Sequence, residues 1–343
     1  MAKRVLWVDI TRAIAIFLVV LGHLNNVADY GQLERIIYTF HMPLFFMISG
    51  FFIKVEKTYD RKTWWNKCIK KYLICLIIPY FIWALIYMKN FIFAPYLLYG
   101  SWLSIKASTT YTCYWFLPCL FVARIYEFAA FTIANKCKIN ANVMAAICCV
   151  VFMAIGLLLP ANNADDKLGL FCSFNIAFVA CSFMFFGFLI KQFLDKIKDK
   201  IAVTLPAFIV SVVLFVFIYI NFVSYQGQFD FMMMCNSYYG PIPVFIAEAV
   251  VGSLMIIFLS MLLAKIPIKW KLMSWLGANT MGIYVIHKKV AEQLYAQYLS
   301  MHADISVYVS SVIIALVTMA IAAAITWVIN KYAPALFGKI RKR

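Results

Sequence analysis

The chain has 343 residues, of which 65% are hydrophobic and 13% charged, with a mean hydropathy of +0.87. A soluble globular chain is nearer about 45–50% apolar and about 25% charged, so this composition excludes that class and predicts a membrane protein. The residue alternation of a transmembrane β-barrel is absent, which favours helical spans. The net charge of +17 does not indicate nucleic acid, because the basic residues cluster between apolar segments.

Cutting the chain at charged or turn-rich connections predicts an all-α polytopic membrane protein with ten helices. The predicted spans are 5–24, 34–53, 72–92, 112–133, 142–160, 170–190, 203–223, 241–264, 272–294 and 305–330. The number of helices could differ from ten by one, mainly because the stretches around 92–111 and 270–304 can be divided in more than one way. No connection is long enough for a soluble domain, so residues 1–343 should form one integral-membrane domain.

The first span carries Asp9, Arg12 and His23 within an otherwise apolar stretch. These charges argue against a cleaved signal peptide. The eleven residues from Arg12 to His23 return to the same helix face, about 16 Å further along the axis. Ionisable groups at membrane depth normally face a protein interior or a water-filled cavity. We therefore predict that this helix carries the chemistry.

The basic connection at residues 54–71 contains seven lysines and arginines together with Trp64 and Trp65. It is typical of a topology signal that lies along the lipid headgroups. The alternative is an anion site for a phosphorylated cosubstrate, because lysines act as point charges for phosphate.

The distribution of lysines and arginines predicts the orientation of the helices. The N-terminus, every second connection and the C-terminal tail hold 23 of the 31 basic residues. Six lie in the opposite connections, namely Arg35, Lys89, Lys106, Lys167, Lys288 and Lys289. This asymmetry places both termini in the cytoplasm.

With that orientation, three of the four histidines fall at a similar depth on different helices. His23 lies near the outer end of the first span, His41 about two turns into the second, and His287 in the outer half of the ninth, near Tyr284. Histidine suits proton transfer near neutral pH, although a lone membrane histidine is more often a structural hydrogen-bonding residue. Two classes remain open: an enzyme that transfers a group from an anionic, phosphate-bearing cytoplasmic donor, and a proton-coupled transporter or lipid flippase.

Other polar or reactive residues suggest structural roles. Arg124 and Glu127 are spaced i, i+3 and are expected to neutralise one another, whereas Glu248 shows no partner. The ten cysteines lie mostly in apolar runs without metal-ligand spacing, so neither a metal site nor disulfides are expected. Ser49-Gly50 is a possible tight helix contact. The sequence does not indicate an oligomeric state.

Four sequence blocks, in order, resemble the membrane acyltransferase family 3. They are DITRAIA running on to LGH (residues 9–23), FHMPLFF with SGFF (40–52), YWFL (114–117), and WLG through MGIYVIH (275–287). The short length is most similar to the sugar O-acetylases of the fucose 4-O-acetylase branch. Ten helices with both termini inside agree with the family.

The resemblance implies transfer of an acyl group from cytoplasmic acyl-CoA, usually acetyl-CoA, to a carbohydrate hydroxyl. His23 would be the general base, and Arg12, next to Asp9, would bind the CoA end or polarise the thioester carbonyl. Within these blocks, the candidates for substrate binding are His41, Ser49, Trp115, Tyr284 and His287.

The sequence differs from the family pattern at the start of the third helix, where members of the family often have an Arg-x-x-Arg pair before a proline. The resemblance implies that the basic connection at residues 54–71 binds the CoA phosphates. Here the chain has Lys67, Lys70 and Lys71 before Pro79, and lysines keep the charge but lose the bidentate fork of arginine. We expect a bacterial inner-membrane enzyme whose partners are acyl-CoA, membrane lipids and a glycan or its lipid-linked precursor. A sugar or lipid-linked-sugar transporter is the alternative, although no repeat between the halves supports it.

Overall fold

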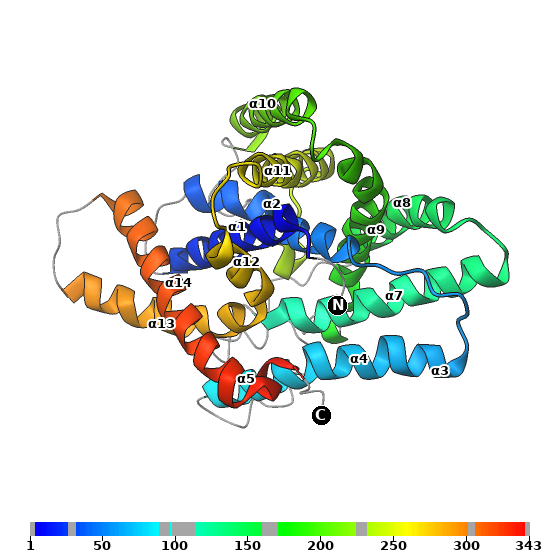
Figure 1. Ribbon diagram of the computed structural model, residues 1–343, viewed down its shortest axis with the longest axis horizontal. Coiled ribbons are helices and arrows are strands. Elements are labelled where there is room, and N and C mark those ends of the chain that lie inside the picture. Colours follow the sequence, from blue (N-terminus) through cyan, green and yellow to red (C-terminus); the bar gives the residue numbers. More distant parts are fainter. Residues whose placement is uncertain are drawn as a thin grey trace. The chain divides into compact units, whose positions relative to one another are not determined.

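The computed structural model describes residues 4–26, 32–88, 97, 114–159, 171–223, 232–300 and 306–339 (Figure 1). Within these ranges the chain is helical, and its β-structure is one isolated bridge between Met233 and Tyr238. The ends of the predicted spans at 89–92, 112–113, 160, 170 and 305 lie outside the described residues. The predicted all-α polytopic fold is confirmed.

Seven helices in the described ranges are long and apolar enough to cross a membrane. They are the composite helix Arg61–Tyr87, α7 (Phe116–Lys136), α8 (Ala141–Leu158), α9 (Phe174–Ile197), α10 (Ile201–Ile218) with its extension to Phe222, α11 (Ile242–Leu263) and α14 (Val307–Tyr332). Each overlaps one of the ten predicted spans.

The other three predicted spans correspond to less apolar or shorter helices. These are α1 (Leu6–Gly22), α2 (Gln32–Gly50) and α13 (Thr280–Ser300). Helix α1 has 17 residues, and α2 and α13 carry charged and polar side chains that lower their hydropathy. These three helices carry six of the predicted site residues, and a seventh, His23, directly follows α1. The six are Asp9, Arg12, His41, Ser49, Tyr284 and His287.

The third span begins earlier than predicted, at Arg61 rather than residue 72. The Asp60 side chain accepts a 2.8 Å hydrogen bond from the Thr63 backbone N–H and caps the helix. From there α3 (Arg61–Thr63), a π-helical segment (Trp64–Ile69), α4 (Lys70–Tyr72), a second π-helical segment (Leu73–Ile77) and α5 (Ile78–Tyr87) form one helix. The prediction that 54–71 is a connection is therefore wrong for its helical part, which carries Lys67, Lys70 and Lys71.

The ninth predicted span, 272–294, is two helices, α12 (Lys271–Ala278) and α13, separated by Asn279. The Asn279 side chain explains the break: its Nδ2 donates to the Trp275 carbonyl at 2.8 Å, and its Oδ1 accepts from Asn330 Nδ2 at 2.9 Å. Gly277 lies so close to α1 that a Cβ there would overlap the backbone oxygen of Asp9. The break therefore lets α12 pack on α1 while α13 takes its own direction.

Three of the six basic residues assigned to the outer connections lie within helices. Arg35 lies within α2, and Lys288 and Lys289 lie within α13, where Lys288 is buried. The assignment of these three residues to connections is therefore wrong. The orientation of the helices stays a prediction from the remaining basic residues.

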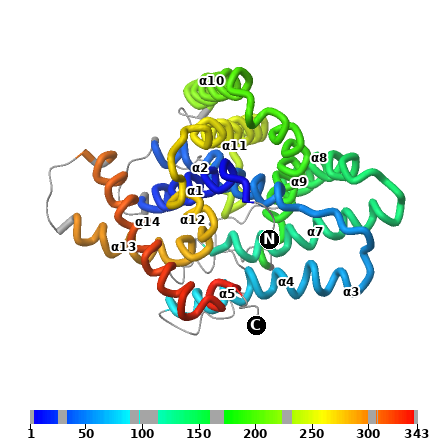
Figure 2. The backbone as a smooth tube through the Cα atoms, in the orientation of Figure 1, coloured from blue at the N-terminus to red at the C-terminus, as the bar shows by residue number. Residues whose placement is uncertain are grey.

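The chain forms two compact units. The first comprises Met1–Phe45, Leu194–Met232 and Gly240–Tyr332. In it α1 packs against α11, α12, α13 and α14, while α10 lies along α11, as Figure 2 shows. Residues of α1 such as Ile10, Ala15 and Ile16 have no exposed surface. Helix α1 is therefore enclosed by protein, which is how ionisable groups on an apolar helix are normally accommodated.

The second unit comprises Phe46–Phe193, Met233–Tyr239 and Ala333–Arg343. In this unit the C-terminal end of α2 lies very close to α9. A Cβ at Gly50 would overlap the backbone oxygen of Met184, and a Cβ at Gly187 would overlap that of Met47. The tight contact predicted at Ser49-Gly50 is thus confirmed.

Candidate active site

His23 and His287 form a direct side-chain pair in the first unit. His23 follows the last residue of α1 and opens a 3-10 turn (His23–Asn26), while His287 lies on α13. The His23 Nδ1 and His287 Nε2 atoms are 2.8 Å apart, and the two rings meet edge to edge, with centroids 5.0 Å apart and planes inclined by 19°. The structure thus joins two of the three histidines expected at one depth.

A second hydrogen bond extends this pair into a chain. His287 Nδ1 lies 2.7 Å from the backbone carbonyl oxygen of Tyr284, three residues earlier on α13. Tyr284, predicted as a substrate-binding residue, is itself buried, and its ring centroid lies 6.1 Å from that of His287. His287 has no exposed surface, whereas His23 is half-buried. Of the two imidazoles, His23 is the one that can reach a substrate.

Tyr38 connects His23 with the third histidine, His41. The Tyr38 ring is 6.5 Å from His23 in an edge-on arrangement and 4.9 Å from His41. His41 is buried, and its Nδ1 lies 2.8 Å from the Ile37 carbonyl oxygen on the same helix. Sequence reasoning missed Tyr38, although its i, i+3 spacing from His41 places both on one face of α2.

Arg12 lies on α1 beside the start of α13. Its Nη2 is 3.5 Å from Thr280 Oγ1, and the guanidinium is within electrostatic reach of Asp9. Asp9 is buried, and its Oδ2 has no hydrogen-bond partner among the described residues. Thr280, which opens α13, was not predicted, and only the break at Asn279 brings it to α1.

Lys288 is a further polar residue that the sequence did not single out. It is adjacent to His287 and 2% exposed, so an ionisable amine lies within the protein next to the histidine pair. Buried lysines are rare and normally have a partner or a function. The sequence feature that could have identified Lys288 is its position directly after His287, the last residue of the block at 275–287.

The remaining predicted site residues belong to the second unit. The Ser49 carbonyl oxygen accepts a 2.7 Å hydrogen bond from Arg124 Nη2, and the buried Trp115 packs against Phe46 and Phe116. Lys67, Lys70 and Lys71 are exposed. Lys67 lies 3.9 Å from Glu56, and Lys71 Nζ lies 4.6 Å from the Tyr72 ring centroid.

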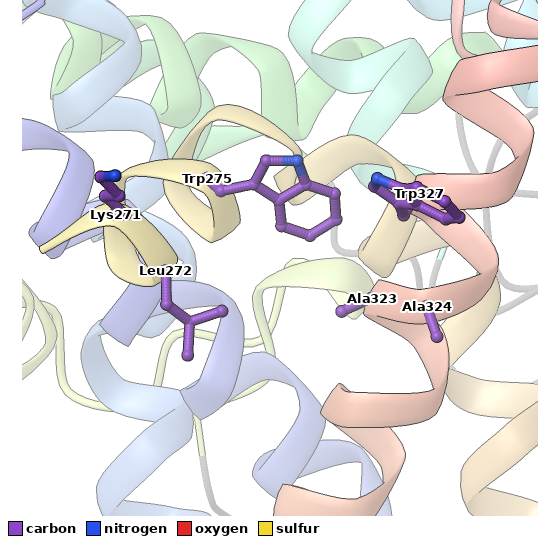
Figure 3. Close-up of a pocket in the computed structure, with 6 residues that line it drawn as sticks. All are labelled: Lys271, Leu272, Trp275, Ala323, Ala324 and Trp327. Atoms are coloured by element: carbon purple, nitrogen blue, oxygen red, sulfur yellow. The ribbon is translucent and has the colours of Figure 1, made fainter.

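Two open grooves are present in the described part of the chain. In the first unit, a groove of about 440 Å³ lies between α12 and α14, with the indoles of Trp275 and Trp327 on its walls (Figure 3). In the second unit, a groove of about 690 Å³ is lined by Arg61, Lys62, Trp64, Trp65 and Ile69. Neither contains a predicted catalytic residue, but the second combines two cations with two indoles.

Trp64 is held rigidly in this basic groove. Its Nε1 donates to Thr132 Oγ1 at 3.0 Å, and its ring packs edge-on against Phe128. Trp65, in contrast, is 54% exposed. Among the described residues, no group of three or more His, Cys, Asp or Glu could hold a metal ion, and the cysteines are free thiols.

The fold is that of a multi-pass α-helical membrane protein, and a hydrogen-bonded histidine pair lies where the end of α1 meets α13. A family model described as "Acyltransferase domain" matches residues 5–331, nearly the whole chain. The chain therefore belongs to the membrane acyltransferase family 3 and is a membrane acyltransferase. Searches of curated proteins and of solved structures found no match.

Proposed function

We propose that this membrane acyltransferase transfers an acetyl group from acetyl-CoA to a hydroxyl of a cell-envelope carbohydrate or its lipid-linked precursor. We place it in the bacterial cytoplasmic membrane, with the donor arriving from the cytoplasm, and in the sugar O-acetylase branch of the family. The observation that carries the proposal is the pair formed by His23 and His287, because it presents one half-buried imidazole supported by a fully buried one.

His23 is the proposed general base. Its Nε2 takes the proton of the acceptor hydroxyl while the hydroxyl oxygen bonds to the thioester carbonyl carbon. The tetrahedral intermediate then collapses, the carbon–sulfur bond breaks, and the leaving thiolate takes the proton back from His23. The carbonyl-rich end of α1, which His23 immediately follows, favours the transient positive charge on the imidazole.

Arg12 is proposed to act on the donor. A guanidinium provides paired N–H donors for a phosphate or for the oxygen that becomes negative during attack on the thioester. Thr280 Oγ1 and nearby Asp9 would orient it. His41 and Tyr284, which are buried in the first unit near Tyr38 and His287, are proposed to shape the acceptor site. Ser49 and Trp115 belong to the second unit and are separate candidates for substrate binding.

The donor phosphates are proposed to bind basic residues of the second unit. The sequence favours Lys67, Lys70 and Lys71, which are exposed on the composite helix. The groove of Arg61, Lys62, Trp64 and Trp65 is a second candidate, because indoles stack on an adenine while cations pair with phosphates. The two sets can be tested separately.

Covalent transfer separates this proposal from a sugar transporter. Purified protein is incubated with acetyl-CoA radiolabelled in the acetyl group and a cell-envelope glycan extract. An acetyltransferase moves the label into the glycan and releases it on mild alkaline ester hydrolysis. Movement of an unmodified sugar across proteoliposomes, with no label in the glycan, would instead support a transporter.

Donor binding tests the role of Arg12. Arg12→Ala should weaken acetyl-CoA binding about tenfold or more, since charged hydrogen bonds contribute about 1.5–3 kcal/mol each. Isothermal titration of the detergent-solubilised protein measures the affinity, with Arg35→Ala as a matched arginine control on α2. Unchanged affinity in Arg12→Ala would remove Arg12 from donor binding.

A further inference from the structure

We infer that His287 is a positioning residue that fixes the tautomer of His23 and leaves the His23 Nε2 lone pair free to accept a proton. The inference rests on the proposed role of His23 as a base. It also changes the predicted role of His287, from a group that contacts substrate to one that acts through another side chain. A side chain with no exposed surface is badly placed to touch a substrate.

The direction of the hydrogen bonds follows from the chemistry of the three groups. A backbone carbonyl can only accept, so the 2.7 Å contact with the Tyr284 oxygen requires the proton of His287 on Nδ1. A neutral His287 then has a bare Nε2, which accepts. The 2.8 Å contact therefore requires the proton of His23 on Nδ1, and a neutral His23 has its lone pair on Nε2.

The support for this chain is rigid. The Tyr284 carbonyl and His287 lie in the same turn of α13, and the hydrogen bonds at both nitrogens of His287 limit rotation of its ring. The start of α13 is fixed in turn by the Asn279–Asn330 hydrogen bond and by the approach of Gly277 to Asp9. The break between α12 and α13 thereby determines where His287 lies relative to the end of α1.

Two amide substitutions separate positioning from packing. The amide of His287→Gln reaches the place of Nε2, so its oxygen can still accept from His23 Nδ1–H. The shorter amide of His287→Asn reaches the place of Nδ1 and can bond to the Tyr284 carbonyl but not to His23. A purely structural role would tolerate the two about equally.

Steady-state transfer to glycan is one readout. We expect kcat to fall about 10- to 100-fold in His287→Asn, as for other residues that orient a functional imidazole, with most of the rate restored in His287→Gln and KM for the acceptor unchanged in both. Equal losses in the two variants, or a raised KM with unchanged kcat, would overturn the inference.

The second readout does not depend on catalysis. Nitrogen-15 NMR of histidine-labelled protein distinguishes the two neutral tautomers, and the chain has four histidines, which single substitutions assign. We expect His23 protonated on Nδ1 in the wild type and in His287→Gln, and on Nε2 in His287→Asn. An Nε2-protonated His23 in the wild type would overturn the inference even if the enzyme is active. Absence of acetyl transfer together with the expected tautomer would instead count against the proposed function alone.

Discussion

Each unit of the molecule contains a buried polar cluster, and the two clusters differ in what they leave available. In the second unit, Arg124 Nη1 contacts Glu127 Oε2 at 2.8 Å, Nη2 donates to the Ser49 carbonyl, and the guanidinium lies 5.3 Å from the Tyr72 ring. The side chains of Arg124 and Glu127 are 7% and 3% exposed. In the first unit, His287 is equally buried, but it bonds to a half-buried His23.

The comparison shows that a buried ionisable group is not by itself evidence of a catalytic site. The charges of Arg124 and Glu127 cancel within one helical turn, which confirms the sequence-based expectation and suits a structural role. His23 instead combines partial exposure with an uncharged hydrogen-bond chain behind it. We therefore expect substitutions in the second unit's cluster to change stability, and substitutions of the histidine pair to change activity.

Loss of one partner of the ion pair should give the largest change in stability. Glu127→Ala leaves the guanidinium of Arg124 buried without its carboxylate, which costs about 3–5 kcal/mol. Thermal unfolding of the purified protein in detergent measures the loss. The double variant Arg124→Met with Glu127→Leu should recover much of it, because no unpaired charge remains. A single variant as stable as the wild type would show that the pair is unimportant for folding.

The approach of α12 to α1 is the next largest expected contribution. Gly277→Ala places a methyl group against the Asp9 backbone oxygen, which cannot move as a side chain can. Overpacking of this kind costs about 1–3 kcal/mol. Gly22→Ala is the matched control, since its Cβ would meet only side-chain atoms of Ile37 and Tyr38, at 3.2 Å. Equal melting temperatures for the two variants would contradict the close approach.

Substitutions in the basic groove should affect donor affinity and leave folding unchanged. Arg61→Gln and Lys62→Gln should each weaken acetyl-CoA binding about two- to fivefold, since exposed charge pairs contribute up to about 1 kcal/mol, and added salt should reduce the difference. Lys136→Gln, also exposed and basic, is the control. If only the Lys67, Lys70 and Lys71 substitutions weaken binding, the groove is not the phosphate site.

The smallest expected effect concerns the start of the composite helix. Hydrogen bonds from Thr63 lower the pKa of the Asp60 carboxyl below its ordinary value, so the cap is at full strength above about pH 3.9, the value for an unstructured aspartate. Its contribution is lost as the pH falls through the lower pKa of the folded state. Melting curves of wild type and Asp60→Asn should therefore converge in acid, since the asparagine cap does not titrate. A constant difference from pH 7 to pH 3 would contradict this assignment.

Most of the helices could be predicted from the sequence because long apolar runs specify them directly. The exceptions have local causes. Asp60 starts a helix within a basic stretch that composition alone marks as a connection, and Asn279 ends one inside an apolar stretch. Both boundaries depend on side-chain hydrogen bonds, which hydropathy does not detect.

The residues of the candidate site could be predicted from the sequence only in part. His23, His41 and His287 are conspicuous as ionisable residues in apolar helices, and their approximate depths follow from helix direction. Their partners do not follow from the sequence, because the contact joins distant segments: His23 and His287 are 264 residues apart. Lys288 was misassigned because a lysine near a helix end usually marks a connection.

The central claim is that His23 carries out proton transfer in acetyl transfer, and His23→Ala tests it most directly. The measurement is the rate of transfer from radiolabelled acetyl-CoA to the glycan extract per mole of folded protein, with the melting temperature recorded in parallel. We predict a loss on the order of 10²- to 10⁴-fold, the usual contribution of a general base, with the melting temperature and yield close to wild type. A folded His23→Ala protein that transfers acetyl at a near-wild-type rate would contradict the account.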